Sequence, residues 1–128
     1  MRYIKFRRAH PGAIMPTYLA PNNVSFILTA HIETEIGAHA VSYVPLGWIV
    51  DLPHSFLLEI RPYPATTLNT DFLVILTTIT GGDEIYAIVR NMSNSDLTVR
   101  TGMQIAQGIL VPSIPIYFSE VDETAPTV

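Results

Sequence analysis

Short runs of Val, Ile, Thr, Phe and Tyr recur along the whole sequence, and Pro, Gly and Asn separate them. β-branched and aromatic residues are typical of strands, whereas this punctuation is typical of turns. No window of about 11 or more residues shows the 3.6-residue apolar period of an amphipathic helix. The pattern therefore predicts an all-β fold, a sandwich or barrel of about ten short strands.

Turns are expected at Pro11–Gly12 and Pro21–Asn23. The sequence contains neither an internal repeat nor a linker, so residues 1–128 are expected to form a single domain. The expected strands are Tyr3–Phe6, Val24–Ala30, Ala40–Val44, Gly47–Leu52, Phe56–Arg61, Asp71–Thr80, Ile85–Asn91, Leu97–Arg100, Ile105–Val111 and Ile114–Phe118.

Charged side chains are scarce for a domain of this size. Hydrophobic residues make up 48% of the chain and charged residues only 14%, although the surface of a small domain is normally rich in charge. Many Thr, Ser and Asn side chains on the outer faces of strands would explain this. Burial of apolar surface against other subunits would also explain it, because obligate interfaces resemble a domain core. The sequence favours the oligomer.

The two ends of the chain carry opposite charge. The first eight residues hold four of the seven basic side chains (Arg2, Lys5, Arg7 and Arg8), and an acidic tail covers residues 119–128. The net charge of −4 would repel a phosphate backbone, so nucleic acid is not an expected partner. We expect the basic N-terminal strand to pair with acidic surface instead.

Several classes of protein are disfavoured by what the sequence lacks. It contains no cysteine, so disulfides and thiol chemistry are excluded. No apolar run reaches the roughly 18 residues of a membrane helix, and the N-terminus lacks the apolar core of a signal peptide. The sequence predicts a protein that is made and kept inside a cell, without a membrane partner.

Four segments, in the same order, resemble motifs of the dUTPase family (the dUTPase and dCTP-deaminase superfamily). The most specific is Gly102–Gln107 followed by Ile109–Pro112, which is close to the family's "GdrIAQlivvP". The others are Met15–Tyr18, Val44–Pro53 and Val89–Asn91. The resemblance implies a jelly-roll-like β-barrel and a homotrimer with sites at subunit interfaces.

Family dUTPases bind and hydrolyse the nucleotide with five motifs, numbered along the chain, and the resemblance also identifies four positions of a nucleotide pocket. Arg61 matches the arginine of the second motif, Thr78 stands at the general-base position of the third, Glu84 is the retained acid of that motif, and Gln107 belongs to the fourth. We interpret these four residues as a vestigial nucleotide pocket.

Other residues that the family uses for hydrolysis are replaced. Ile27 stands where the first motif has an acid near the metal, Pro62 replaces a phosphate-binding serine, and Gly81 replaces the tyrosine that stacks on deoxyribose. Proline has neither the hydroxyl nor the amide donor of serine, and threonine is not a base at neutral pH without an activating partner. No glycine follows Gly108, so we expect the Gly-rich C-terminal arm of the family to be absent.

These replacements lead to the hypothesis of a protein that is not an enzyme, with no catalytic residue, metal or cofactor. We expect a trimeric structural or interaction protein of viral or phage origin, in the virion or the host cytoplasm. It would serve as a capsid decoration or cement subunit, or bind a host protein. The alternatives are a non-hydrolysing deoxynucleotide-binding protein and a divergent dUTP nucleotidohydrolase.

The four histidines are not expected to bind metal. His10, His31, His39 and His54 are scattered along the chain without metal-ligand spacing. We interpret them as structural or surface residues, and Trp48 as core or interface packing.

Overall fold

The structure is a computed structural model, which describes residues 4–19 and 24–123. Arg2, the expected turn at Pro21–Asn23 and the end of the acidic tail lie outside the described residues. The described part contains eleven strands and one short helix: β1 Lys5–Arg8, β2 Thr17–Tyr18, β3 Ser25–Thr29, β4 Thr34–Ile36, β5 Val41–Asp51, β6 Phe56–Pro62, α1 Pro64–Asn69, β7 Phe72–Ile75, β8 Thr77–Ile79, β9 Glu84–Asn91, β10 Leu97–Val99 and β11 Gln104–Pro112.

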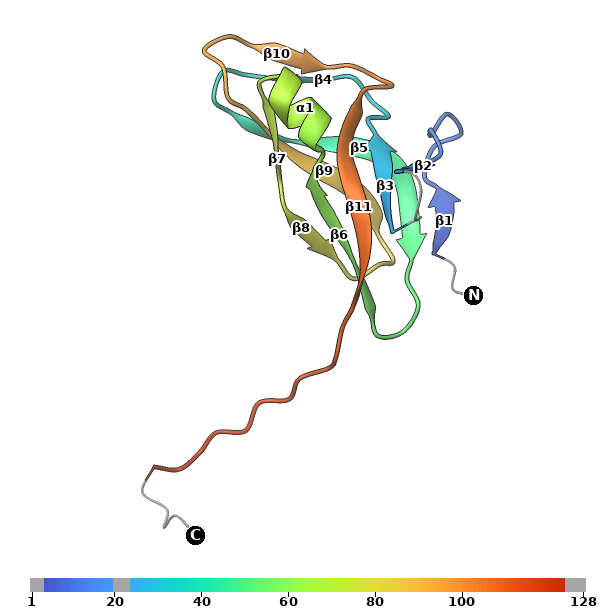
Figure 1. Cartoon of the computed structure of the whole chain (residues 1–128), viewed down its shortest axis with the longest axis vertical. Coiled ribbons are helices and arrows are strands. Elements are labelled where there is room, and N and C mark those ends of the chain that lie inside the picture. Colours follow the sequence, from blue (N-terminus) through green and yellow to red (C-terminus); the bar gives the residue numbers. More distant parts are fainter. Residues whose placement is uncertain (1–3, 20–23, 124–128) are drawn as a thin grey trace.

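The strands form two larger sheets and one small one (Figure 1). The four-stranded sheet has the order β1-β5-β9-β7, the five-stranded sheet has the order β2-β3-β11-β6-β8, and β10 pairs with β4. All of these pairings are antiparallel. The prediction of an all-β fold is confirmed.

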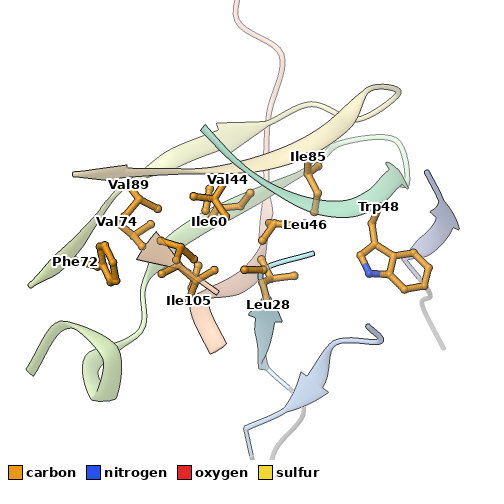
Figure 2. Packing of buried hydrophobic residues seen from close by; sticks show 14 of the residues in the cluster. Leu28, Val44, Leu46, Trp48, Ile60, Phe72, Val74, Ile85, Val89 and Ile105 are labelled. Atoms are coloured by element: carbon orange, nitrogen blue, oxygen red, sulfur yellow. The ribbon is translucent and has the colours of Figure 1, made fainter. Parts of the chain in front are cut away.

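The hydrophobic core lies between the two larger sheets. Along β5, Val44, Leu46 and Val50 are completely buried, and Figure 2 shows Val44 and Leu46 in the same cluster as Ile60 of the other sheet. Each such side chain contributes about 1.5–3 kcal/mol through its removal from water. Trp48 is 3% exposed and donates its indole N–H to the Ile14 carbonyl, which confirms its role in core packing.

The basic N-terminal strand is held by its own chain. β1 pairs with β5, and Arg7 donates to the Asp51 carboxylate at 2.7 Å. This hydrogen bond holds the pKa of Asp51 below its usual range. Arg8 lies over the Trp48 ring at 4.7 Å from its centroid and donates to the Ala13 carbonyl. The predicted pairing with acidic surface is therefore found for Arg7.

Several elements differ from the sequence prediction, and three of these differences lie after β6. The expected single strand Asp71–Thr80 is divided at Leu76: β7 joins the four-stranded sheet and β8 joins the five-stranded sheet. The helix α1 was not predicted, because six residues are too few to show a helical period. Ile114–Phe118 is not a strand; it belongs to an extended segment that leaves the barrel after β11 (Figure 1).

β5 is one strand where the sequence predicted two, and Gly47 accounts for the difference. Pro45 pairs with Tyr86 and Ile49 pairs with Glu84, so β5 carries two extra residues at a bulge around Gly47. Gly47 has φ of +83°, which favours glycine. A Cβ atom here would lie 2.8 Å from the Ala13 Cβ and 3.0 Å from the His31 Cγ. The strand therefore continues through the bulge only because this residue has no side chain.

Gly47→Ala is expected to lower the free energy of unfolding by about 2–4 kcal/mol. Alanine is strained at a positive φ, and its Cβ atom would also be too close to Ala13 and His31. The matched control is Gly82→Ala, where φ is +94° but a Cβ atom would have no other atom within 4 Å. Only backbone strain applies there, and we expect a loss of about 1–2 kcal/mol. Urea unfolding of both variants measures the difference, and equal losses would show that the contacts with Ala13 and His31 carry no cost.

Candidate functional site

A polar row lies on the outer face of the five-stranded sheet. Leu58 and Ile60 of β6 are completely buried in the core, so the alternation of the strand turns Glu59 and Arg61 to the opposite face. Arg61 pairs with Gln107 of β11 in the strand register, which places both side chains on that face. Gln107 donates from Nε2 to the Pro62 carbonyl at 2.9 Å.

Thr78 lies in the adjacent row of the same face, and the polar row is taken below to comprise Arg61, Gln107, Glu59 and Thr78. Thr78 is an exposed residue of β8 and pairs with Glu59 of β6. Arg61 donates from Nη2 to the Glu59 carboxylate at 2.8 Å. The Glu59 side chain is only 18% exposed and that of Arg61 is 38% exposed. Three of the four predicted pocket positions are thus neighbours on one sheet, and Glu59 connects them.

Glu59 was missed by the sequence analysis. Its signal was its position two residues before Arg61 in an expected strand, since residues i and i+2 share a face. Motif comparison alone gave no reason to single it out.

Ile27 extends this face on the other side of Gln107. It pairs with Gln107 on one side and with Thr17 of β2 on the other. Ile27 is 7% exposed and does not belong to the core cluster, whereas its neighbours Phe26 and Leu28 do. The first, second and fourth motif positions therefore meet in one row across β3, β11 and β6, with an apolar side chain at the first.

Glu84 lies elsewhere. It belongs to β9 of the four-stranded sheet, where its carboxylate accepts from the Tyr86 hydroxyl at 3.1 Å and contacts His10 Nε2 at 3.1 Å. The hydrogen bond to Glu84 raises the pKa of Tyr86 above its usual value. The structure thus brings Arg61, Thr78 and Gln107 together and places Glu84 on the other sheet.

Two histidines that are distant in sequence meet beside Glu84. The rings of His10 and His31 are stacked, with centroids 5.0 Å apart. His31 Nδ1 is buried and has no hydrogen-bond partner among the described residues. Glu84 and this ring stack together attach the loop after β1 to the barrel.

The polar row does not fit a magnesium ion held by the protein. Magnesium is held by carboxylates together with substrate phosphates. Within residues 4–19 and 24–123, no group of three or more His, Asp and Glu side chains is arranged to hold a metal. The one carboxylate of the row, Glu59, is bonded to Arg61. What the row supplies is a guanidinium, an amide and a hydroxyl, which are donors for anionic oxygen atoms.

The segment after β11 exposes large apolar side chains. Ile114, Ile116, Tyr117 and Phe118 are 79–99% exposed, and the segment extends away from the barrel (Figure 1). Concentrated apolar exposure of this kind marks an interaction surface. No helix in the part of the chain described by the structure has the length and apolarity needed to cross a membrane.

Solved structures define the class of this fold. The dUTPase from phage phi11 of S. aureus superposes with a TM-score of 0.85 at 11% identity, over 95% of this chain and 97% of that chain. The Staphylococcus bacteriophage 80alpha dUTPase with dUPNHPP gives a TM-score of 0.84 at 11% identity, over 100% of this chain and 93% of that one. The two sheets and their connections are therefore a dUTPase-type β-barrel.

Relatives with similar sequences show the family to which the chain belongs. A deoxyuridine 5'-triphosphate nucleotidohydrolase of Helicobacter pylori (strain P12) is 31% identical over 129 residues, covering 95% of this chain and 89% of the relative. One from Gloeothece citriformis (strain PCC 7424) is 30% identical over 128 residues, covering 97% and 88%. No protein-family model matches the chain. The chain belongs to the deoxyuridine 5'-triphosphate nucleotidohydrolase family.

The hypothesis of a structural protein without enzymatic activity is wrong. Relatives that match nearly the full length of this chain, from several species, are named as enzymes. The expectations of a pseudoenzyme and of a capsid decoration or cement subunit are therefore wrong as well. They rested on replaced motif residues, such as Ile27 and Thr78, and on the missing Gly-rich arm, and they treated the polar side chains that remain on the sheet as vestigial. That Arg61, Thr78, Glu84 and Gln107 share a nucleotide pocket stays a prediction.

Glu84→Ala is expected to lower the pKa of Tyr86 toward its ordinary value, because the hydrogen bond that holds the phenol protonated is removed. Titration of the Tyr86 ring by NMR, with Tyr86→Phe to assign its signal, measures this change. Asp83→Ala is the control, since Asp83 is the neighbouring exposed acid. A Tyr86 pKa that is the same in wild type and Glu84→Ala would contradict the contact.

Proposed function

We propose that this chain is a divergent dUTP nucleotidohydrolase that holds the phosphate groups of dUTP at the polar row of Arg61 and Gln107. The observation that carries the proposal is the pairing of these two residues in adjacent strands. β11 lies in a segment that resembles a dUTPase motif, β6 carries the matched Arg61, and both side chains face away from the core.

The chemistry of the row suits the binding and orientation of phosphate. Hydrolysis of dUTP requires attack by water at a phosphorus atom and departure of pyrophosphate, and negative charge on the phosphoryl oxygens must be stabilised throughout. A guanidinium donates to phosphate in a bidentate manner, and such charge-assisted bonds are about twice as strong as neutral ones. Gln107 is held by the Pro62 carbonyl, so its amide is already oriented beside Arg61.

We also propose a homotrimer. The scarcity of charge and the exposed side chains of Ile114, Ile116 and Phe118 support an assembly in which neighbouring subunits cover apolar surface. A viral or phage source, a host-protein partner and a location in the virion or host cytoplasm stay predictions.

The purified chain is expected to release pyrophosphate from dUTP in the presence of magnesium, and to prefer dUTP to dCTP and dTTP. Arg61→Ala should lower kcat/KM by about 10- to 100-fold, because a charge-assisted hydrogen bond to the substrate is lost. The matched control is Arg100→Ala, since Arg100 is an exposed arginine that lies 3.6 Å from Glu33. Steady-state kinetics measure these effects, and light scattering measures the subunit number.

Absence of pyrophosphate release at high enzyme concentration would contradict the proposed activity. Equal losses in Arg61→Ala and Arg100→Ala would instead contradict the assignment of the polar row. A monomeric mass in solution would contradict the trimer alone.

A further inference from the structure

Glu59 and Arg61 form an ion pair inside the polar row. The two side chains are two residues apart in β6 and share its outer face, with Arg61 Nη2 2.8 Å from Glu59 Oε2. The remaining outward residues of adjacent strands are neutral, so Glu59 is the one carboxylate in the two rows formed by Ser25, Ile27, Gln107, Ile109, Glu59, Arg61 and Thr78. The charge of the arginine is therefore matched by one internal counter-ion.

The pair does not satisfy the guanidinium fully. Arg61 Nε is buried and has no acceptor among the described residues, although a guanidinium has five N–H donors. A carboxylate fixed on the same strand reaches only one side of the guanidinium, as the contact through Nη2 shows. A phosphate group that approaches from solvent can instead accept two parallel hydrogen bonds.

We propose that Glu59 is a positioning residue. Its carboxylate forms an ion pair with Arg61 in the free protein, and this ion pair breaks when an anionic phosphate group binds to Arg61. The inference rests on the proposed function, because it assumes that Arg61 receives the phosphate groups of the nucleotide. The exchange leaves the Glu59 carboxylate beside a bound anion. Glu59 therefore lowers the affinity of the row for phosphate, both by competition for the guanidinium and by repulsion of like charge.

The ion pair is weak enough to be exchanged. Partly exposed pairs between arginine and carboxylate contribute little, since water and salt screen both charges. The phosphate ligand carries more charge than one carboxylate, and its bidentate geometry matches the guanidinium. Glu59 thus moderates binding and holds the Arg61 guanidinium in one orientation while no ligand is present.

Glu59→Gln tests this directly, because glutamine keeps the shape of the side chain and removes its charge. We expect inorganic pyrophosphate and dUTP to bind the full-length variant about two- to fivefold more tightly than wild type, by calorimetry at low salt. The gain should shrink as salt is added. The matched control is Glu33→Gln, which removes a glutamate that lies near Arg100 on an exposed surface, and its affinity should equal that of wild type.

A double-mutant comparison separates the exchange from a structural effect. Glu59→Gln in the background of Arg61→Ala should bring no gain in pyrophosphate affinity, because the guanidinium that Glu59 occupies is absent. Unchanged or weaker pyrophosphate binding by Glu59→Gln would overturn the inference, as would a gain that persists without Arg61. Absence of pyrophosphate binding to both wild type and Glu59→Gln would overturn it too.

The outcome is distinguishable from failure of the proposed function. Tighter pyrophosphate binding by Glu59→Gln, in a protein that does not hydrolyse dUTP, would support the role of Glu59 and remove the proposed activity. Turnover of dUTP by wild type, with no change of pyrophosphate affinity in Glu59→Gln, would support the proposed activity and remove the role of Glu59.

Discussion

The inward packing of Leu58 and Ile60 is the interaction on which the polar row depends. Both side chains are completely buried between the two sheets, and the two-residue period of a strand then forces Glu59 and Arg61 to the other face. A slip of one residue in β6 would place both charges in the core. The free energy needed to remove them from water would far exceed the stabilisation from their ion pair. The hydrophobic core thus fixes the position of the charged site without contacting it.

Much of this fold follows from local sequence pattern. The strands β3, β6, β9 and β11 were predicted within a few residues, because each combines apolar alternation with a turn signal at its end. The division of Asp71–Thr80 was not predictable in this way. A continuous β-branched run gives no sign that Leu76 separates strands of two different sheets, since that depends on pairing with β9 and β6, which are remote in sequence.

The candidate site shows the same limit. Arg61 and Gln107 were found through motifs, but their pairing is a property of the register between β6 and β11. Glu59 carries no motif signal, and the ion pair with Arg61 became visible only with side-chain geometry. Glu84 was predicted from its place in a motif, yet it lies on the other sheet and bonds to Tyr86 and His10.

The functional expectation failed because loss of activity was inferred from replaced motif residues and a missing arm. Family membership rests on identity spread over nearly the whole chain, 31% over 129 residues, and not on Ile27 or Thr78 alone. Stabilisation of phosphate charge needs donors in the right place, and a sheet face can supply them from any strand that crosses it. Replaced residues in a motif therefore say less about function than the side chains that share the same face of the sheet.

The scarcity of charge had two explanations, and the exposed apolar side chains bear on the choice between them. If polar strand surfaces were the cause, the outer faces would carry Thr, Ser and Asn. On the outer face of the four-stranded sheet, however, Val41, Tyr43 and Ile75 are 41–66% exposed, and Tyr43 and Ile75 both pair with Ile88 in one row. The segment after β11 adds four more exposed apolar side chains. Apolar surface in two such places favours burial between subunits over a polar coat.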